Sequence, residues 1–354
     1  MKRETRQFNL GDIKIGGGAP VSVQSMTKTD TRDIDATVEQ ISQLEKAGCD
    51  IVRLAVPDME AAKALSEIKN QTNIPLVSDI HFDYLLALEA IKQGVDGMRI
   101  NPGNIGSKKR IKAVVDAVKE RNIPIRIGVN SGSLEKDILK KHGSPTPDAL
   151  AESAMRHIAI LEDMDFFDIK ISVKSTDVMR MIEAYKIIAE KTDYPLHLGV
   201  TEAGTIKMGT IKSSVGIGSL LAQGIGDTIR VSLTGDPVDE IIVGIDILKS
   251  LGHRKHGIEL ISCPGCGRLE IDLMKLVNEI EQKIEHIDLP RPIKIAVLGC
   301  VVNGPGEASD ADIGIAGGKG KGMMYKNGKL IRSFKEEQIV DELAKELETF
   351  RVVQ

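Results

Sequence analysis

Three of the four cysteines occur at spacings that are typical of metal ligation or thiol redox chemistry. Cys263 and Cys266 form a Cys-Pro-Gly-Cys sequence between an expected strand and an expected helix, where a helix dipole would lower the pKa of both thiols. Cys300 ends a second expected strand, and the Gly-Pro-Gly sequence after it predicts a chain reversal that returns Glu307 to the same centre. These four residues are therefore candidate metal ligands.

This ligand set differs from those of most zinc and electron-transfer sites. A structural zinc usually has four Cys or His ligands, but no histidine accompanies this set, and His286 is expected deep in the following helix. An electron-carrying [4Fe–4S] cluster normally has four cysteines. Three cysteines and one carboxylate favour a [4Fe–4S] cluster with one distinct iron that can act as a Lewis acid, while the spacing alone leaves zinc open. Cys49 stands apart and is interpreted as a small buried residue.

A second group of candidate functional residues, all of them basic, lies inside segments that otherwise resemble buried strands. These basic residues are Arg53, Arg99, Arg126, Lys170 and Arg230. Because successive side chains of a strand point to opposite faces, Arg126 and Asn130 share the face opposite to Ile127. The same alternation recurs elsewhere and places Ser232 with Arg230. The aliphatic face must pack against helices, so the polar face points into the centre of the fold.

Several cations are thus predicted to converge on one poorly hydrated site. The neighbouring carboxylates Asp79, Asp168 and Glu202 are too few to neutralise them. A polyanionic ligand fits this deficit, and the forked guanidinium group suits a diphosphate. Structural salt bridges would explain one such arginine, but five basic residues with matching alternation favour a phosphate-type site. Asp79 and His81 end the third strand, where they could bind hydroxyls or move protons.

The elements that must position these residues alternate regularly along the chain. Short runs rich in β-branched residues begin near residues 21, 51, 75, 97, 124, 166, 195 and 227, and segments with helical spacing separate them. Eight such units predict an N-terminal TIM (β/α)8 barrel rather than a doubly wound sheet.

The pattern changes near residues 250–257, which predicts a barrel over residues 1–255 and a small C-terminal α/β domain over 256–354. Within the latter, strands are expected at 258–262, 293–298 and 312–316, and helices at 269–287 and from about 335. A hairpin is expected to turn at Asn327-Gly328. Gly16, Gly17 and Gly18 suit a tight hairpin before the first strand, and the GGKGKG run from Gly317 suits a surface turn.

Composition excludes several classes of partner. The 354 residues include 47 Lys+Arg and 51 Asp+Glu, a net charge of −4, with six Phe, four Tyr and no Trp. Nucleic acid is an unfavoured partner, because neither a basic excess nor a supply of stacking side chains is present. No apolar run approaches the roughly 18 residues of a membrane span, and the N-terminus lacks a signal peptide. We therefore expect a cytoplasmic protein with reduced thiols.

Five motifs taken together resemble the 4-hydroxy-3-methylbut-2-enyl diphosphate synthase family of the non-mevalonate isoprenoid pathway. They are CPGCGR from Cys263, GCVVNGPGEASDADIGIAGG from Gly299, MRINPGN from Met98, RIGVNSGSL from Arg126 and LGVTEAG from Leu198. The resemblance covers essentially the whole chain and its two-domain form.

This resemblance implies reductive dehydroxylation and ring opening of 2-C-methyl-D-erythritol 2,4-cyclodiphosphate, with electrons from reduced flavodoxin or ferredoxin. It implies a [4Fe–4S] cluster on Cys263, Cys266, Cys300 and Glu307, and an acid/base role for Glu202. The implied diphosphate contacts are Arg53, Arg99, Arg126, Asn130, Lys170, Arg230 and Ser232. Asn303 would contact the substrate from the cluster side, and family members are homodimers in which one subunit's cluster domain closes over the other's barrel.

Two other functions fit parts of the sequence. One is a phosphate-binding barrel lyase or transferase with a structural zinc appendage. The other is an iron–sulfur electron-transfer module, which would leave the charged strands without a purpose.

Overall fold

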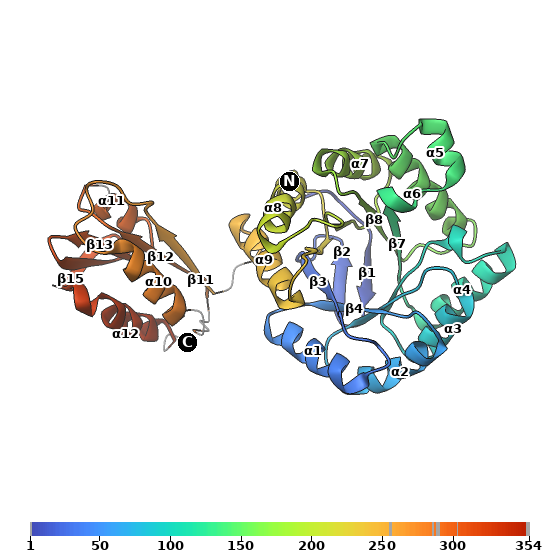
Figure 1. Ribbon diagram of the computed structural model, residues 1–354, viewed down its shortest axis with the longest axis horizontal. Helices are drawn as coiled ribbons and strands as arrows, with labels where there is room; N and C mark the ends of the chain where they lie inside the picture. Colours follow the sequence, from blue (N-terminus) through green and yellow to red (C-terminus); the bar gives the residue numbers. More distant parts are fainter. Residues whose placement is uncertain (1, 255–256, 285–286, 288–290, 303, 352–354) are drawn as a thin grey trace. The chain divides into compact units, whose positions relative to one another are not determined.

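The eight predicted strands of the N-terminal half form one parallel sheet that curls into a barrel (Figure 1). The computed structural model describes residues 2–254, 257–284, 287, 291–302 and 304–351, and the chain forms two compact units, Met1–Arg254 and Lys255–Gln354. The barrel strands are β3 (Ser22–Met26), β4 (Ile51–Ala55), β5 (Leu76–Asp79), β6 (Gly97–Arg99), β7 (Ile125–Asn130), β8 (Ile169–Lys174), β9 (His197–Leu198) and β10 (Thr228–Ile229). A parallel bridge between Ile171 and Leu196 joins β8 to the segment that leads into β9, which confirms the predicted barrel.

Helices surround this sheet (Figure 1). They are α1 (Ile34–Lys46), α2 (Met59–Asn70), α3 (Tyr84–Lys92), α4 (Lys108–Arg121), α5 (Lys136–His142), α6 (Pro147–Glu162), α7 (Val178–Lys191), α8 (Ile206–Ala222) and α9 (Pro237–Ser250), with short 3-10 turns η1 (Pro102–Asn104) and η2 (Ser131–Ser133). Several of them begin at an aspartate whose carboxylate accepts a backbone hydrogen bond, as Asp58 does from Ala61. Such a cap stabilises a helix by about 1 kcal/mol and fixes where each strand-to-helix loop ends.

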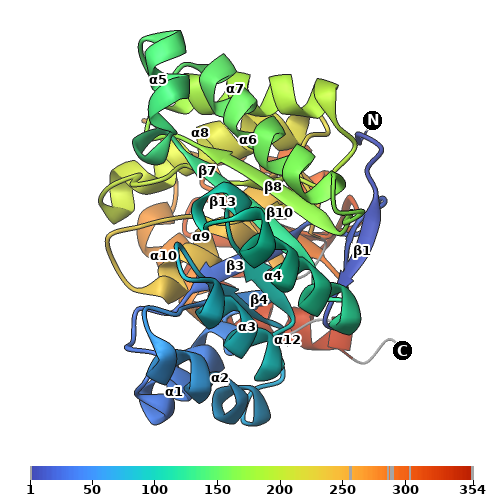
Figure 2. The ribbon, with the colours of Figure 1, turned by 90° about the vertical axis from the view of Figure 1, so that its right-hand side faces the viewer.

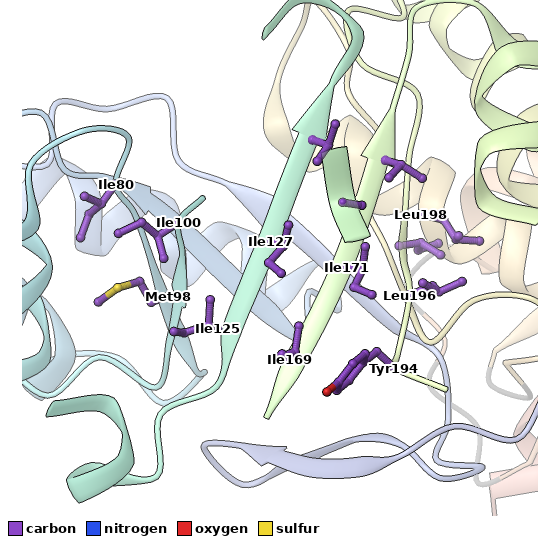
Figure 3. Close-up of a cluster of buried hydrophobic side chains, with 14 of the residues drawn as sticks. Ile80, Met98, Ile100, Ile125, Ile127, Ile169, Ile171, Tyr194, Leu196 and Leu198 are labelled. Carbon is purple, nitrogen blue, oxygen red and sulfur yellow. The ribbon is translucent and has the colours of Figure 1, made fainter. Parts of the chain in front are cut away.

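The predicted alternation of faces holds along the barrel strands. Ile125, Ile127 and Val129 of β7 are buried in the layer between sheet and helices, together with Ile169 and Ile171 of β8. Figure 3 shows part of this layer on the two strands, with Met98 and Ile100 beside it. The intervening side chains must therefore point into the barrel, where the charged residues lie.

An N-terminal hairpin covers the end of the barrel from which β7 and β8 start (Figure 2). Its strands are β1 (Gln7–Leu10) and β2 (Ile13–Gly16), and Phe8, Leu10 and Ile15 pack against Ile51 and Val77. The hairpin turns at residues 11–12, so the expected turn at Gly16 to Gly18 instead follows it and leads to β3. Gly16 has φ +77°, and a Cβ there would lie 2.0 Å from the carbonyl oxygen of Arg6.

The C-terminal unit is a five-stranded mixed sheet packed against helices. Its elements are β11 (Ile258–Ser262), α10 (Leu273–Ile284), β12 (Ile293–Leu298), α11 (Gly304–Ser309), β13 (Ile313–Gly318), β14 (Lys321–Lys326), β15 (Lys329–Lys335), η3 (Glu336–Gln338) and α12 (Ile339–Arg351). Strands β11, β12 and β13 are parallel, and β14 and β15 continue the sheet as antiparallel hairpins. The predicted turn at Asn327-Gly328 is confirmed, with both residues at positive φ.

Two local predictions in this unit are wrong, and a third holds only in part. The helix expected from Leu269 begins at Leu273, because the preceding segment is held by other contacts: the Glu270 carboxylate accepts a hydrogen bond from the backbone of Lys319. The Gly-Pro-Gly sequence does not form a simple reversal but lies within α11 (Gly304–Ser309), since a proline is compatible with the first turn of a helix. Of the GGKGKG run, only Lys319 and Gly320 form the turn, and the rest belongs to β13 and β14.

Among the described residues, no helix combines the length and the apolar character that crossing a bilayer requires.

Replacing Leu10 by alanine should destabilise the barrel by about 2–5 kcal/mol, because it removes a side chain that is 2% exposed in the hairpin cluster. Urea unfolding followed by circular dichroism measures the effect. The control is Leu85→Ala, whose side chain is 48% exposed and should cost within about 0.5 kcal/mol. Equal effects of the two changes would show that the hairpin does not seal the barrel.

Candidate functional site: a cationic barrel mouth and a cysteine-bearing sheet edge

A cavity of about 230 Å³ opens at the carboxyl ends of the barrel strands. We call it the mouth cavity, and its lining residues are Arg53, Asp79, His81, Arg99, Arg126, Asn130, Lys174, Thr201, Arg230 and Ser232. Eight of these come from the predicted set. The carboxyl end of a TIM barrel is where this fold builds its active sites.

Arg99 is held rigidly at the centre of the predicted cluster. Its Nη1 donates to Asp79 Oδ1 at 3.1 Å and lies 3.0 Å from His81 Nδ1, while Nη2 donates to the Gly128 carbonyl at 3.0 Å. A Cβ on Gly128 would lie 2.6 Å from Arg99 Nε, so only glycine permits this close passage. Asn101 forms two hydrogen bonds with the backbone of Gly128 and so fixes the residue whose carbonyl group holds Arg99.

Arg126 and Arg230 keep free donors among the described residues, whereas Arg53 donates from Nε and Nη2 to Met26 Sδ at 3.2 and 2.9 Å. Arg126 Nη1 donates to Ser172 Oγ at 2.7 Å, but its Nε and Nη2 have no hydrogen-bond partner among the described residues. Arg53 Nε lies 3.5 Å from Asp79 Oδ2. Arg230 Nη2 lies 3.7 Å from Glu240, a buried carboxylate outside the cavity that sequence reasoning missed. Unpartnered buried donors are costly, so these groups are suited to receive an acceptor-rich ligand.

Electrostatics point to the same kind of ligand. Burial, and then the charges of Arg230 and Arg99 against the opposing pull of Asp79, lower the pKa of Arg53 to about 10. Burial followed by Arg126 and Arg230 lowers the pKa of Lys174 well below its usual value. Burial alone would raise the pKa of Asp79, but Arg53, His81 and Arg99 hold it far below its usual range. One ionised carboxylate therefore faces five basic side chains in the mouth cavity.

Lys170 does not line the mouth cavity, and Lys174 takes the place that the sequence assigned to it. The reason is the stagger of tilted strands in a closed barrel. The row of paired residues that begins at Asp79 continues through Arg99 and Arg126 to Lys170, and it descends from the mouth to the floor. Lys174, the last residue of β8 on the same face, stays at the mouth. Its position at the strand's carboxyl end was the signal available in the sequence.

The remaining predicted barrel residue, Glu202, follows the lining residue Thr201 but is not itself part of the lining. It is exposed and has φ +51°. A non-glycine residue in this region is strained by roughly 1–3 kcal/mol, and such strain is concentrated at functional sites.

The three cysteines follow the carboxyl ends of β11 and β12, two adjacent strands of the C-terminal sheet. Strands β11 and β12 are adjacent and parallel, so Cys263, just after β11, lies beside the end of β12, and Gly299 N donates to its Sγ at 3.5 Å. Hydrogen bonds from the backbone and side chain of Arg268 lower the pKa of Cys266. Cys266, and after it Cys300, raise the pKa of Arg268. The guanidinium group therefore lies near both thiols. Because α10 begins only at Leu273, this arginine, rather than the predicted helix dipole, is the cause of the shift.

These donors suit an iron–sulfur cluster in their chemistry, because three free thiols, one with a lowered pKa, are soft anionic ligands. Within the described residues, no three His, Cys, Asp or Glu side chains form a group that could hold a metal ion. Glu307 is exposed on α11, and Asn303 lies outside the described residues.

Family comparisons cover both units. Residues 5–245 match the model of the GcpE TIM-barrel domain, and residues 259–349 match that of the GcpE protein C-terminal domain. The chain belongs to the GcpE family. This membership confirms the family that the sequence motifs indicated.

Relatives of this family match over nearly their whole length. The chain is 62% identical over 348 residues to the 4-hydroxy-3-methylbut-2-en-1-yl diphosphate synthase (flavodoxin) of Clostridium perfringens, covering 98% of this chain and 99% of that protein. It is 61% identical over 345 residues to the enzyme of the same name from Clostridium acetobutylicum, covering 98% of each. The barrel also resembles dihydropteroate synthase from Stenotrophomonas maltophilia, with TM-score 0.51, 12% identity and coverage of 70% and 97% of the two chains. That likeness concerns the fold alone.

Replacing Lys174 by methionine should stabilise the ligand-free barrel by about 1–3 kcal/mol, because it removes a buried like charge. It should weaken binding of inorganic pyrophosphate by about tenfold or more, through loss of one charge-assisted contact. The pKa of Lys174 is lower in the folded protein than in the unfolded protein, so the folded protein binds fewer protons at this residue. The free energy of unfolding of wild type should therefore rise as the pH rises above neutrality. It should rise less in the variant, which lacks this group. Thermal unfolding between pH 7 and pH 10, with and without pyrophosphate, measures all three effects.

The matched control is Lys186→Met on α7, which breaks only a surface pair with Glu183 and should change none of these quantities appreciably. A loss of stability in Lys174→Met without a loss of pyrophosphate binding would contradict the assignment of the mouth cavity.

Proposed function

We propose that this protein converts 2-C-methyl-D-erythritol 2,4-cyclodiphosphate to (E)-4-hydroxy-3-methylbut-2-enyl diphosphate, as a flavodoxin-dependent oxidoreductase of non-mevalonate isoprenoid biosynthesis. Relatives that are 61–62% identical over nearly the full length carry the name of the enzyme that forms this product. The observation that carries the proposal is the mouth cavity, in which five basic side chains face one carboxylate. A diphosphate fits such a charge balance, because it offers several anionic oxygens to the guanidinium groups.

In this proposal the diphosphate binds to the free guanidinium donors of the mouth cavity. Arg126 offers Nε and Nη2, and Arg99 and Arg230 each offer Nε. The hydroxyl of Ser232 and the amide of Asn130 complete the polar wall. Glu240 holds Arg230 in place, because its carboxylate also accepts from Ser25 Oγ at 3.1 Å and from Leu233 N at 3.1 Å. An already positioned arginine loses little conformational entropy when the anion binds.

The proposed cofactor is a [4Fe–4S] cluster held by Cys263, Cys266, Cys300 and Glu307. When bound, it would supply electrons received from flavodoxin or ferredoxin and one iron able to bind a substrate oxygen. Support comes from the three free thiols and from the lowered pKa of Cys266. Such thiols need a reducing compartment, which agrees with the proposed cytoplasmic location.

The overall reaction takes up two electrons and two protons and releases one water. A carbon–oxygen bond of the cyclic diphosphate breaks, so the opened diphosphate gains a terminal oxygen, while the hydroxyl group leaves as water. We assign Glu202 as the acid that protonates the leaving oxygen, because it follows Thr201 at the rim of the mouth cavity. His81 and Asp79 would orient the substrate hydroxyls.

The anion-binding residues and the cysteines belong to different units of the chain. The reaction requires the substrate to meet the cluster, so the two units must approach each other, either within one chain or between two. We propose a homodimer in which the cluster-bearing unit of one subunit serves the barrel of the other.

Anaerobic purification followed by iron and sulfide analysis tests the cofactor. Wild type should contain about four iron and four sulfide per chain when fully loaded, and Cys300→Ser should lose most of both together with turnover. Cys49→Ser is the matched control, because the Cys49 thiol is buried within the barrel and its pKa is raised to about 12 by burial. It should retain iron, sulfide and turnover with reduced flavodoxin. A colourless protein that contains zinc would refute the cluster assignment.

Glu202→Gln should lower kcat by about 10²–10⁴-fold, because the amide keeps the shape of the side chain but cannot donate the proton. Binding of inorganic pyrophosphate and the iron content should stay close to wild type. The control is Glu190→Gln, an exposed carboxylate near the end of α7, which should leave kcat unchanged. If Glu202→Gln turned over at the wild-type rate, the proton would have to come from another group.

A further inference from the structure

A second, much smaller cavity lies at the floor of the barrel, beneath the mouth cavity. Its volume is about 10 Å³, the size of one water molecule. We call it the floor cavity, and its lining residues are Phe8, Leu10, Gln24, Val77, Met98, Pro124, Ile125, Arg126 and Lys170. The apolar members come mainly from the N-terminal hairpin and its contacts, so the cavity is closed toward that end.

The polar members of the floor cavity lack hydrogen-bond partners among the described residues. Lys170 is 2% exposed and Gln24 is 1% exposed, yet Lys170 Nζ and both polar side-chain atoms of Gln24 are unpartnered. A buried ammonium group without a partner is costly, so burial favours the neutral amine. Burial, and then the charge of Arg126 against the opposing pull of Asp227, lower the pKa of Lys170 to about 7.

Arg126 is the wall that the two cavities share. Its Nε and Nη2 are unpartnered, so an anion in the mouth cavity would bind to this guanidinium. The bound anion would then compensate the positive charge of Arg126, which disfavours a proton on Lys170. Anion binding in the mouth cavity and protonation of Lys170 both depend on the charge of Arg126. The two events are therefore thermodynamically linked, and each favours the other.

We propose that Lys170, through a water molecule held between it and Gln24 in the floor cavity, takes up a proton when a diphosphate occupies the mouth cavity. This inference rests on the proposed anion site. It gives a purpose to a lysine that lies too deep to touch the substrate. Because ring opening turns a bridging ester oxygen of the diphosphate into a terminal anionic oxygen, the stored proton would balance the greater negative charge of the product.

The direction of the effect with pH follows from the groups around Lys170. Arg126 on β7 and Asp227 before β10 face it, and Lys174 on its own strand and His197 on β9 belong to the same interior. In the free protein Lys170 is mostly charged at pH 6 and mostly neutral at pH 8. An anion that raises its pKa should therefore cause little uptake by Lys170 at pH 6 and up to one proton at pH 8.

Isothermal titration calorimetry with inorganic pyrophosphate, in two buffers of different ionisation enthalpy, counts the protons. At pH 8 wild type should take up about 0.5–1 proton more than Lys170→Met, and this difference should shrink toward zero at pH 6. The difference between proteins removes the protonation of pyrophosphate itself and of Lys174. Lys186→Met, on the barrel surface, should match wild type.

The outcomes separate the two proposals. If pyrophosphate does not bind wild type, the proposed diphosphate site fails. If it binds but wild type and Lys170→Met take up equal numbers of protons at pH 8, only the role of Lys170 is overturned. Should the variant fail to fold, carbon-13 NMR of lysine Cε in wild type decides: one resonance should titrate near pH 7 and move to higher pH with pyrophosphate, and its absence would overturn the inference.

Discussion

Repulsion between like charges inside a dry barrel is the constraint on which the N-terminal unit depends. Arg53, Arg99, Arg126, Lys174 and Arg230 face a cavity that offers them a single lining carboxylate, Asp79. Burial reduces the screening of these charges by water, and burial together with the neighbouring cations lowers the pKa values of Arg53 and Lys174. The unliganded site is thus kept in a state of higher energy that an anion relieves. In the proposed function, this relief would favour the binding of a diphosphate.

Other residues of the barrel stabilise the fold and hold the charged side chains in place. Helix-facing aliphatic side chains such as Ile127 and Ile171 supply the burial that stabilises the fold. Gly128 allows the Arg99 side chain to pass close to its backbone, and Glu240 anchors Arg230 from outside the cavity. The N-terminal hairpin packs against the barrel floor, so the interior charges are shielded from that side as well. Preorganised charges of this kind need no rearrangement when the ligand arrives.

The C-terminal unit must stabilise negative rather than positive side-chain charges. Its cysteines carry thiols that become anionic, and Arg268 stabilises the Cys266 thiolate in the free protein. A parallel strand pair brings the two cysteine segments together, because both chains leave the sheet on the same side. The proposed function would therefore combine a cationic site for the anionic end of the substrate with an anionic site for a metal cluster. The two sites have incompatible local charges, which is a physical reason for housing them in separate units.

The sequence by itself determined the eight buried strands, the inward face of Arg126 and the position of the cysteines after two strands of the C-terminal unit. Such features depend on alternation and spacing, which are local properties of the chain. Which lysine reaches the mouth cavity was decided only by the tertiary structure. Lys170 and Lys174 share one strand and one face, and the stagger between β7 and β8 sets their depth. The start of α10 at Leu273 likewise depends on a contact from Glu270 to a distant turn. Depth and long-range contacts arise from closing the barrel and the sheet, so the alternation of side chains along one strand does not determine them.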